Sequence, residues 1–205
     1  MRFPILTLAL LSTLLILPSI TLANPTPSTE HLHTRGQGTI TFIASLLNNG
    51  LKIIRLDKSV RYFTPERLDD VKTRSSEALQ SLDEAIATGK STGHFDPLSS
   101  HVIAAICVPL KPFYSSMINA IRDKREELTA AKYKDEMLKT LVALRTKSRE
   151  LGELAKRILT EPDGSFCLLL EDYVDKRYSK VIDEYKGINS GDTDDVEEEV
   201  WVAED

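Results

Sequence analysis

Four histidines are the side chains in this sequence best suited to acid–base or metal chemistry. His31 and His33 are separated by one residue and could hold a metal ion loosely, but two ligands in a segment of low apolar content make a weak site. His101 has Ser100 and Ser115 as candidate nucleophiles nearby, yet the sequence contains no GxSxG or related motif. These patterns favour a protein with no catalytic residues, no cofactor and no metal.

Charged pairs lead to the same expectation. The carboxylates of Glu126-Glu127 and Glu171-Asp172 are typical of solvated helix faces. The basic pairs Lys124-Arg125 and Lys176-Arg177 adjoin acidic residues and form no stripe that would bind nucleic acid. We therefore expect neither an enzyme nor a nucleic-acid-binding protein. An unrecognised hydrolase would need a cleft with buried carboxylates whose pKa values are strongly shifted.

An apolar segment from Leu98 to Ile121 suggests binding of an apolar ligand instead. Its apolar residues spread beyond one helical seam, as in a central helix packed on several sides, or in a helix that lines a groove between bundle helices. Pro109 and Pro112 predict a kink or break that would favour the groove. We expect the groove to be lined by Ile106, Leu110, Phe113, Met117, Leu141, Leu144 and Leu170.

Residues 1–23 have the three parts of a cleavable signal peptide. Arg2 supplies the positive start, Ile5 to Leu17 the apolar run, and Thr21 and Ala23 the small residues before a cut after Ala23. An uncleaved anchor is the alternative, because the run approaches the roughly 20 residues that span a bilayer. Polar residues interrupt it, so we expect a secreted, extracellular protein, free or bound to the cell wall, with no membrane span after cleavage.

Cys107 and Cys167 are the two cysteines of the chain. Because the secretory route is oxidising, we expect them to form a disulfide. The closed loop of about 60 residues would contribute about 4 kcal/mol to stability in the chain-entropy estimate. Two free buried thiols that act as small apolar side chains are the alternative.

The remaining pattern is helical. From Thr39 onward apolar residues recur at helical spacing, and no useful stretch alternates with period two, so we predict an all-α bundle of about five amphipathic helices. Caps and helix breakers mark the starts and ends of several elements: Thr64-Pro65, Gly89, Asp96-Pro97, Pro162 and Gly187. The fourth helix should run from about Lys134 to Leu159. The third helix should be kinked or broken near Pro109 and Pro112.

The domain boundaries follow from these elements. We expect a signal peptide over residues 1–23, a flexible leader over 24–38, the bundle over 39–188 and an acidic disordered tail over 189–205. The tail has eight acidic residues and no basic one, and it carries the only tryptophan, Trp201, which could dock on a partner.

Several segments of the bundle also match a known family. They are Leu82–Thr88, Val108–Leu110, Ile118–Ile121, Lys124-Arg125, Leu141–Leu154 and Val181–Tyr185. With them the chain, over about Ile40 to Gly187, resembles the fungal hydrophobic surface-binding protein A and cell-wall galactomannoprotein family. The resemblance implies a secreted or wall-associated protein that adsorbs to hydrophobic surfaces or holds lipids in an apolar cavity. The 28% charged residues and the acidic tail depart from the family pattern and favour free secretion.

Two hypotheses follow. The first is a non-catalytic binding module that takes up a lipid or sits on a hydrophobic surface through the third helix. The second is an interaction protein or effector that contacts a cell-wall or host protein through its charged faces and the segment around Trp201.

Overall fold

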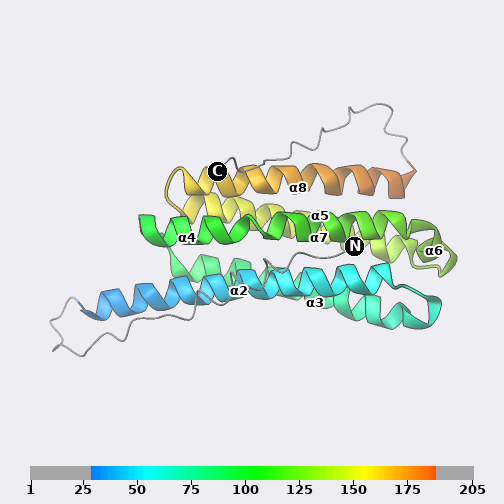
Figure 1. The fold of residues 1–205 in the computed structure, drawn as a ribbon, viewed down its shortest axis with the longest axis horizontal. Coiled ribbons are helices and arrows are strands. Elements are labelled where there is room, and N and C mark those ends of the chain that lie inside the picture. The colour runs from blue at the N-terminus through cyan, green and yellow to red at the C-terminus, as the bar shows by residue number, and fades with distance from the viewer. Residues whose placement is uncertain (1–28, 188–205) are drawn as a thin grey trace, which may run out of the picture. The chain divides into compact units, whose positions relative to one another are not determined.

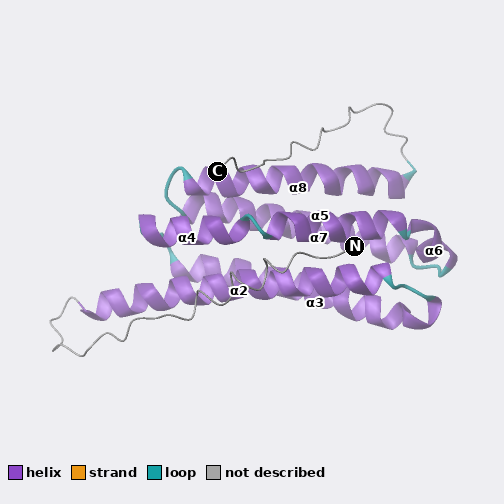
Figure 2. Ribbon diagram, in the orientation of Figure 1, coloured by secondary structure: helices purple, strands orange, loops and turns teal. Residues whose placement is uncertain are grey.

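The computed structural model describes residues 29–187, with side chains from Gln37 onward. The predicted signal peptide, the first part of the leader and the acidic tail with Trp201 lie outside this range. The chain divides into two compact units, residues 1–33 and 34–205, and the bundle belongs to the second. Helices make up its regular structure, and the described residues contain no strand (Figure 2).

The helices follow the predicted order. They are α2 (Thr29–Arg61), α3 (Leu68–Thr92), α4 (Pro97–Cys107), α5 (Leu110–Asp123), a short α6 (Arg125–Ala130), α7 (Lys134–Ile158) and α8 (Asp163–Lys186), with a 3₁₀ turn η2 (Pro65–Arg67) before α3. Figure 1 shows α4 and α5 following one another as two parts of one long element. The prediction of an all-α bundle with a broken third helix is therefore confirmed.

The long helices pack as a ring. Helix α7 packs against α3 and α8, and α8 packs against α4 and α5. Helix α2 closes the ring through side-chain hydrogen bonds to α3, α4 and α5. Asn49 Nδ2 donates to Ser81 Oγ of α3 at 3.0 Å, Thr39 Oγ1 to Ser99 Oγ of α4 at 3.3 Å, and Arg61 to Ser116 Oγ of α5 at 2.8 Å. The interior of this ring holds the core.

Local sequence signals determine where α4 and α5, the two parts of the predicted third helix, begin and end. Asp96 caps α4, because its carboxylate accepts a hydrogen bond from the backbone N–H of Ser99 at 3.0 Å. Pro97 occupies the first turn, where no intrahelical donor is needed. Helix α4 ends at Cys107, and α5 starts at Leu110, which places Pro112 in a first turn as well. The break therefore accommodates both interior prolines.

Two boundaries differ from the expectation. Helix α3 passes through Gly89 and ends at Thr92; the next residue, Gly93, has a positive φ of 70°, which suits a residue without a side chain. Gly89 serves packing instead, since a β-carbon there would lie 2.9 Å from Phe42 and Leu154. Helix α2 starts at Thr29, so the segment 29–38 of the predicted leader is helical, as extending an existing helix costs little per residue.

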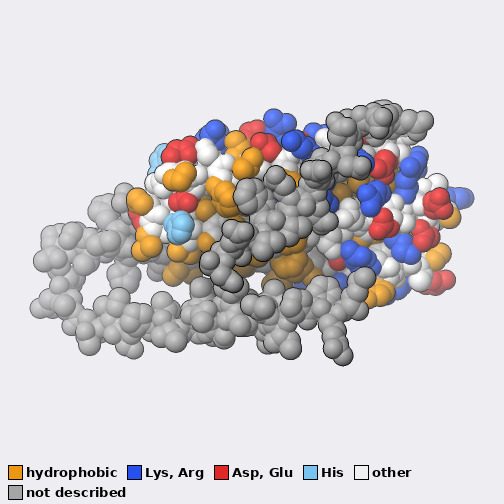
Figure 3. All heavy atoms as spheres, turned by 45° about the horizontal axis from the view of Figure 1, so that its top comes forward, with side chains coloured by type: hydrophobic (Ala, Val, Ile, Leu, Met, Phe, Trp, Pro, Cys, Tyr) orange, Lys and Arg blue, Asp and Glu red, His pale blue; other side chains and the backbone are white. Residues whose placement is uncertain are grey.

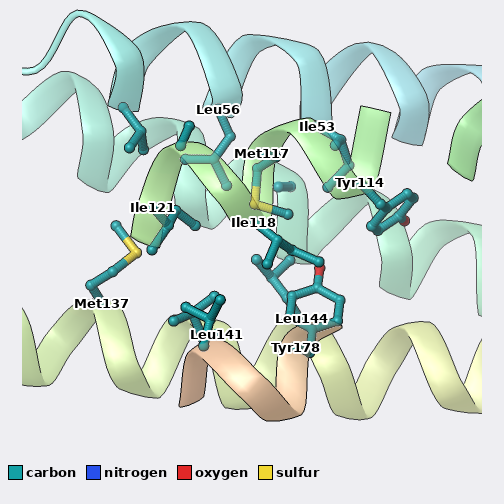
Figure 4. Packing of buried hydrophobic residues seen from close by; sticks show 14 of the residues in the cluster. Ile53, Leu56, Tyr114, Met117, Ile118, Ile121, Met137, Leu141, Leu144 and Tyr178 are labelled. Atoms are coloured by element: carbon teal, nitrogen blue, oxygen red, sulfur yellow. The ribbon is translucent and has the colours of Figure 1, made fainter. Parts of the chain in front are cut away.

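Buried apolar residues form two clusters. The central core fills the space between α2, α3, α5, α7 and α8, and Figure 4 shows part of it. The second core lies toward α4 and includes Phe42, Ile103, Ala155 and Cys167. Leu110 and Leu151 pack against both clusters and so mark their junction.

The segment Pro97–Asp123, which contains α4 and α5, is long and apolar enough to cross a membrane by length and composition, with a mean hydropathy of 1.3. The sequence predicts no membrane span after cleavage; this segment meets the criterion by length and composition only, because α4 and α5 follow one another across the prolines. Only 28% of the apolar window is buried in the bundle. Leu98, Val102 and Val108 of this segment are exposed.

Candidate functional site

A pocket of about 90 Å³ lies at the junction of the two cores. Five helices contribute to it, and most of the lining is apolar. The lining residues are Phe42, Leu46 and Asn49 of α2; Ile103 and Cys107 of α4; Leu110, Lys111 and Tyr114 of α5; Ser148, Leu151, Gly152 and Ala155 of α7; and Cys167, Leu170, Glu171 and Val174 of α8.

The break between α4 and α5 brings residues from both helices to this pocket. Cys107 is the last residue of α4 and Leu110 the first of α5, and both line it. Glycines let the walls approach. A β-carbon at Gly50 of α2 would lie 2.6 Å from Leu110 Cδ2, and one at Gly152 of α7 would lie 2.7 Å from Glu171 Cγ.

Polar side chains gather on the part of the lining that adjoins the central core. The Tyr114 hydroxyl donates a hydrogen bond to Asn49 Oδ1, and Asn49 Nδ2 donates to Ser81, whose hydroxyl donates to the Ala78 carbonyl at 2.8 Å. Ser148 is buried beside them, and its Oγ has no hydrogen-bond partner. The pocket therefore has a predominantly apolar wall and a polar end.

Glu171 is the charged residue of this polar end. Its side chain is buried, with 9% of the residue exposed, and Oε1 has no hydrogen-bond partner. Burial, followed by the negative charges of Asp175 and Asp172, raises the pKa of Glu171 to about 7. The prediction of a solvated Glu171-Asp172 face was wrong for Glu171, because this residue lies on the buried stripe of α8 and only Asp172 is exposed.

Tyr178 adds a third unpartnered group. It is fully buried, its hydroxyl has no hydrogen-bond partner, and burial raises its pKa. Tyr114, Ser148 and Glu171 lie close enough to affect that pKa as well. Ser148 and Glu171 line the pocket, and Tyr178 lies behind the lining, close enough for both to affect its pKa. Buried polar groups without partners are costly in a folded protein and mark a place where a further polar group can bind.

This arrangement does not assemble the carboxylate pair of a hydrolase. Asp175, one turn after Glu171, accepts hydrogen bonds from Arg145 Nε and Nη2 at 2.6 and 2.9 Å. Hydrogen bonding to Arg145 lowers the pKa of Asp175. Asp175 does not line the pocket, so Glu171 is the single carboxylate in the lining.

Cys107 of α4 and Cys167 of α8 both line the pocket, and both are free thiols in this structure. A hydrogen bond between the two thiols, together with burial, raises the pKa of Cys107. The same hydrogen bond lowers the pKa of Cys167. The two sulfur-bearing side chains are therefore neighbours. The disulfide stays a prediction.

The seven residues predicted to line a groove occupy three kinds of position. Leu110 and Leu170 line the pocket. Ile106 and Phe113 are half-buried outside its lining, and Phe113 packs against the central core. The other three are fully buried in the central core: Met117, Leu141 and Leu144 (Figure 4).

Sequence reasoning missed the polar end. Glu171 follows Cys167 by four residues and precedes Val174 by three and Tyr178 by seven, and all three are buried. That helical spacing is the signal that could have found Glu171. The same argument applies to Ser148, which lies four residues after buried Leu144 on α7.

Exposed apolar side chains lie on the surface of α4 and α8. Leu98 of α4 is 75% exposed and Leu169 of α8 is 65% exposed; Val102 and Phe166 are exposed on the same two helices, and Val108 is exposed directly after α4. Figure 3 shows hydrophobic side chains gathered toward the end of the bundle that carries α4 and the start of α8, and charged side chains toward the other end. Adjacent apolar residues on packed helices indicate a contact surface.

These features define a class of protein, a helical bundle with an internal apolar pocket that ends in polar groups. Within that class, residues 40–156 match the family Hydrophobic surface binding protein A. The chain belongs to this family, and the resemblance noted in its sequence is confirmed.

Solved structures share the fold. AfMP4p in complex with palmitic acid superposes with a TM-score of 0.69 at 21% identity, over 72% of this chain and 99% of that chain. Ligand binding domain 1 of the Penicillium marneffei MP1 protein, complexed with arachidonic acids, gives a TM-score of 0.68 at 12% identity, over 72% and 98% of the two chains. Identities this low show a common fold. No curated protein matches the sequence.

Proposed function

We propose that this protein is a non-catalytic carrier that binds a single-chain lipid, such as a fatty acid, in the pocket between α4 and α8. The observation that carries the proposal is the mostly apolar lining drawn from five helices, with polar atoms at one end. An aliphatic chain matches such a wall, and its polar end matches the unpartnered groups. Membership of the family and the fatty acids in the complexes of AfMP4p and MP1 support it.

The pocket must widen to take up such a ligand. Its volume is about 90 Å³, whereas pockets for drug-sized ligands measure roughly 300–1,000 Å³. Helix α4 is the element best suited to move, because it has 11 residues and buries only Ser100, Ile103 and Ala104. Its junction with α5 at Val108 and Pro109 lacks a continuous helical ladder. Displacing α4 therefore sacrifices few buried contacts.

The proposal is tested by lipid extraction and mass spectrometry of the natively purified protein, followed by displacement of a fluorescent fatty acid with palmitic acid. We expect a co-purifying single-chain lipid and saturable displacement. A protein that carries no lipid and releases no probe would contradict the proposal.

A second candidate function, adsorption to hydrophobic surfaces, is favoured by the exposed apolar residues of α4 and α8. Leu98 and Leu169 are the most exposed of them. Charged substitutions at both positions, Leu98→Asp and Leu169→Asp, should reduce retention on a hydrophobic resin. Tyr62→Asp is the matched control, because Tyr62 is 67% exposed in the turn after α2. Equal loss with both changes would remove the support for a defined surface.

We also propose export of the protein with cleavage after Ala23, on the basis of the sequence of residues 1–23. The mass and N-terminal sequence of the protein recovered from the culture medium test this. A mature chain that starts at Asn24 is expected, and retention of the full chain in the cell membrane would contradict it. The effector hypothesis depends on the tail with Trp201, which lies outside the described residues.

A further inference from the structure

We propose that Glu171 and Ser148 form a headgroup subsite that selects single-chain lipids ending in an uncharged O–H group, a carboxylic acid or an alcohol. The inference rests on the proposed lipid-binding function and names the chemistry of its ligand. It starts from two side chains of the pocket lining, 9% and 7% exposed, whose Oε1 and Oγ atoms have no partner.

The geometry places both groups on facing helices of the pocket. Ser148 and Gly152 lie one turn apart on α7, and the missing side chain at Gly152 leaves room for Glu171 of α8 against that helix. Glu171 Oε1 and Ser148 Oγ make no hydrogen bond of normal geometry, and the hydroxyls of Tyr114 and Tyr178 lie near Ser148. A ligand group that both donates and accepts hydrogen bonds can therefore join Glu171 and Ser148. A carboxylic acid or a hydroxyl group does so with one O–H bond and its lone pairs.

The charges around the subsite disfavour a charged headgroup. The charges that act on Glu171 are those of Asp175 and Asp172 of α8 and of Arg149 and Glu153 of α7. The other titratable groups around the pocket are Tyr178 of α8, which is electrostatically coupled to Glu171, and the lining residues Lys111, Tyr114, Cys107 and Cys167. Asp175 and Asp172 raise the pKa of Glu171, and Arg149 opposes them. A neutral Glu171 offers an O–H donor, whereas an ionised Glu171 would repel an ionised fatty acid in a site of low polarity.

Lys111 is the one competing anchor in the lining, because its ammonium group could pair with a carboxylate. Its Nζ atom instead lies over the ring of Tyr173, 3.7 Å from the ring centre, and Tyr173 does not line the pocket. A cation held on an aromatic face is partly satisfied there. The two anchors therefore predict opposite charge states for a bound carboxyl group, neutral beside Glu171 and ionised beside Lys111.

The test is a carbon NMR titration of palmitic acid, labelled at its carboxyl carbon, bound to the full protein. The subsite predicts that the pKa of the bound carboxyl group is raised by at least about one unit above that of the free acid. In Glu171→Gln this rise should shrink, because a neutral amide replaces the carboxyl, while palmitic acid remains bound. In Lys111→Met it should persist.

The alternatives give different results. A lowered pKa of the bound carboxyl group that returns to its free value in Lys111→Met would overturn the subsite and place the headgroup on Lys111. An unshifted pKa in the wild-type protein would overturn it too. Absence of any bound signal would instead contradict the lipid-binding function itself, so the two failures are distinguishable. Matching circular dichroism spectra of the variants exclude a folding defect.

Displacement of the fluorescent probe by an alcohol is a second, independent test. Hexadecanol should displace the fluorescent fatty acid from the wild-type protein, and Ser148→Ala should weaken that displacement several-fold. Hexadecyltrimethylammonium, which has the same chain and a permanent charge without an O–H group, should displace the probe at least tenfold less well than hexadecanol. Equal displacement by the two probes would contradict selection by an O–H group.

Discussion

A β-carbon at Gly152 would lie 2.7 Å from Glu171 Cγ and 2.8 Å from its Cβ, which is closer than side chains approach one another. Glycine at this position of α7 therefore sets how deeply Glu171 of α8 sits beside the pocket. Because the near atoms belong to the stem of Glu171, the side chain cannot turn away without moving its helix.

The first prediction follows from this contact. Gly152→Ala should destabilise the protein by about 1–2 kcal/mol, because overpacking outweighs the better helix propensity of alanine. Gly50→Ala is the matched control. A β-carbon at Gly50 meets only the terminal Cδ2 of Leu110, which can rotate. Urea unfolding of both variants measures the difference, and equal stabilities would show that the Gly152 contact is not restrictive.

The second prediction concerns the pH dependence of stability. The pKa of Glu171 is raised from 4.5 to about 7 in the folded protein. The folded state therefore keeps a proton that the unfolded chain loses. As a result, the contribution of Glu171 to the free energy of unfolding falls as the pH rises from 4.5 to 7. Glu171→Gln should match the wild type near pH 4 and exceed it by up to about 3 kcal/mol at pH 8.

Urea unfolding at the two pH values checks this difference. Other carboxyl groups, including Asp175 and Asp96, have lowered pKa values and act in the opposite direction. The comparison between variant and wild type removes their contribution. Glu126→Gln, at an exposed position of α6, is the control and should show no such dependence on pH. Parallel curves for wild type and Glu171→Gln would contradict a buried, protonated Glu171.

The third prediction is the disulfide between Cys107 and Cys167. Oxidised protein should be 2 Da lighter than reduced protein, as expected for the loss of two hydrogens, and more stable by about 2–4 kcal/mol. Since the bond would tie α4 to α8 at the pocket, we expect palmitic acid to enter more slowly in the oxidised form. Intact mass, thermal unfolding and stopped-flow binding with and without reductant measure these effects. Two reactive thiols in the oxidised, natively purified protein would contradict the bond.

Much of the fold could be predicted from the sequence because its signals are local. Asp96 and Pro97 begin α4 through a capping hydrogen bond and a fixed φ, and neither effect depends on the rest of the chain. Pro109 breaks the helix for an equally local reason. Gly89 shows the limit of such reasoning. It resembles a helix end in sequence, but its neighbours Phe42 and Leu154 come from other helices.

The candidate site was harder to predict, because a pocket depends on which faces meet. Met117 and Leu144 have the same apolar character as Leu110 and Leu170, yet the first two are fully buried in the central core and the last two line the pocket. Glu171 was hidden beside Asp172, since two adjacent carboxylates are usually solvated. Its helical spacing with Cys167, Val174 and Tyr178 indicates a buried face, but the close packing on Gly152 depends on α7 and is not visible in the pattern of α8.

The central claim, a lipid site in this pocket, is tested most directly by titrating palmitic acid into two variants that differ by one position. Leu170 lines the pocket, and Leu169 is 65% exposed on the same helix. Leu170→Trp should obstruct the pocket and weaken binding at least tenfold, whereas Leu169→Trp should bind as the wild type does. Equal affinities of the two variants would contradict the claim.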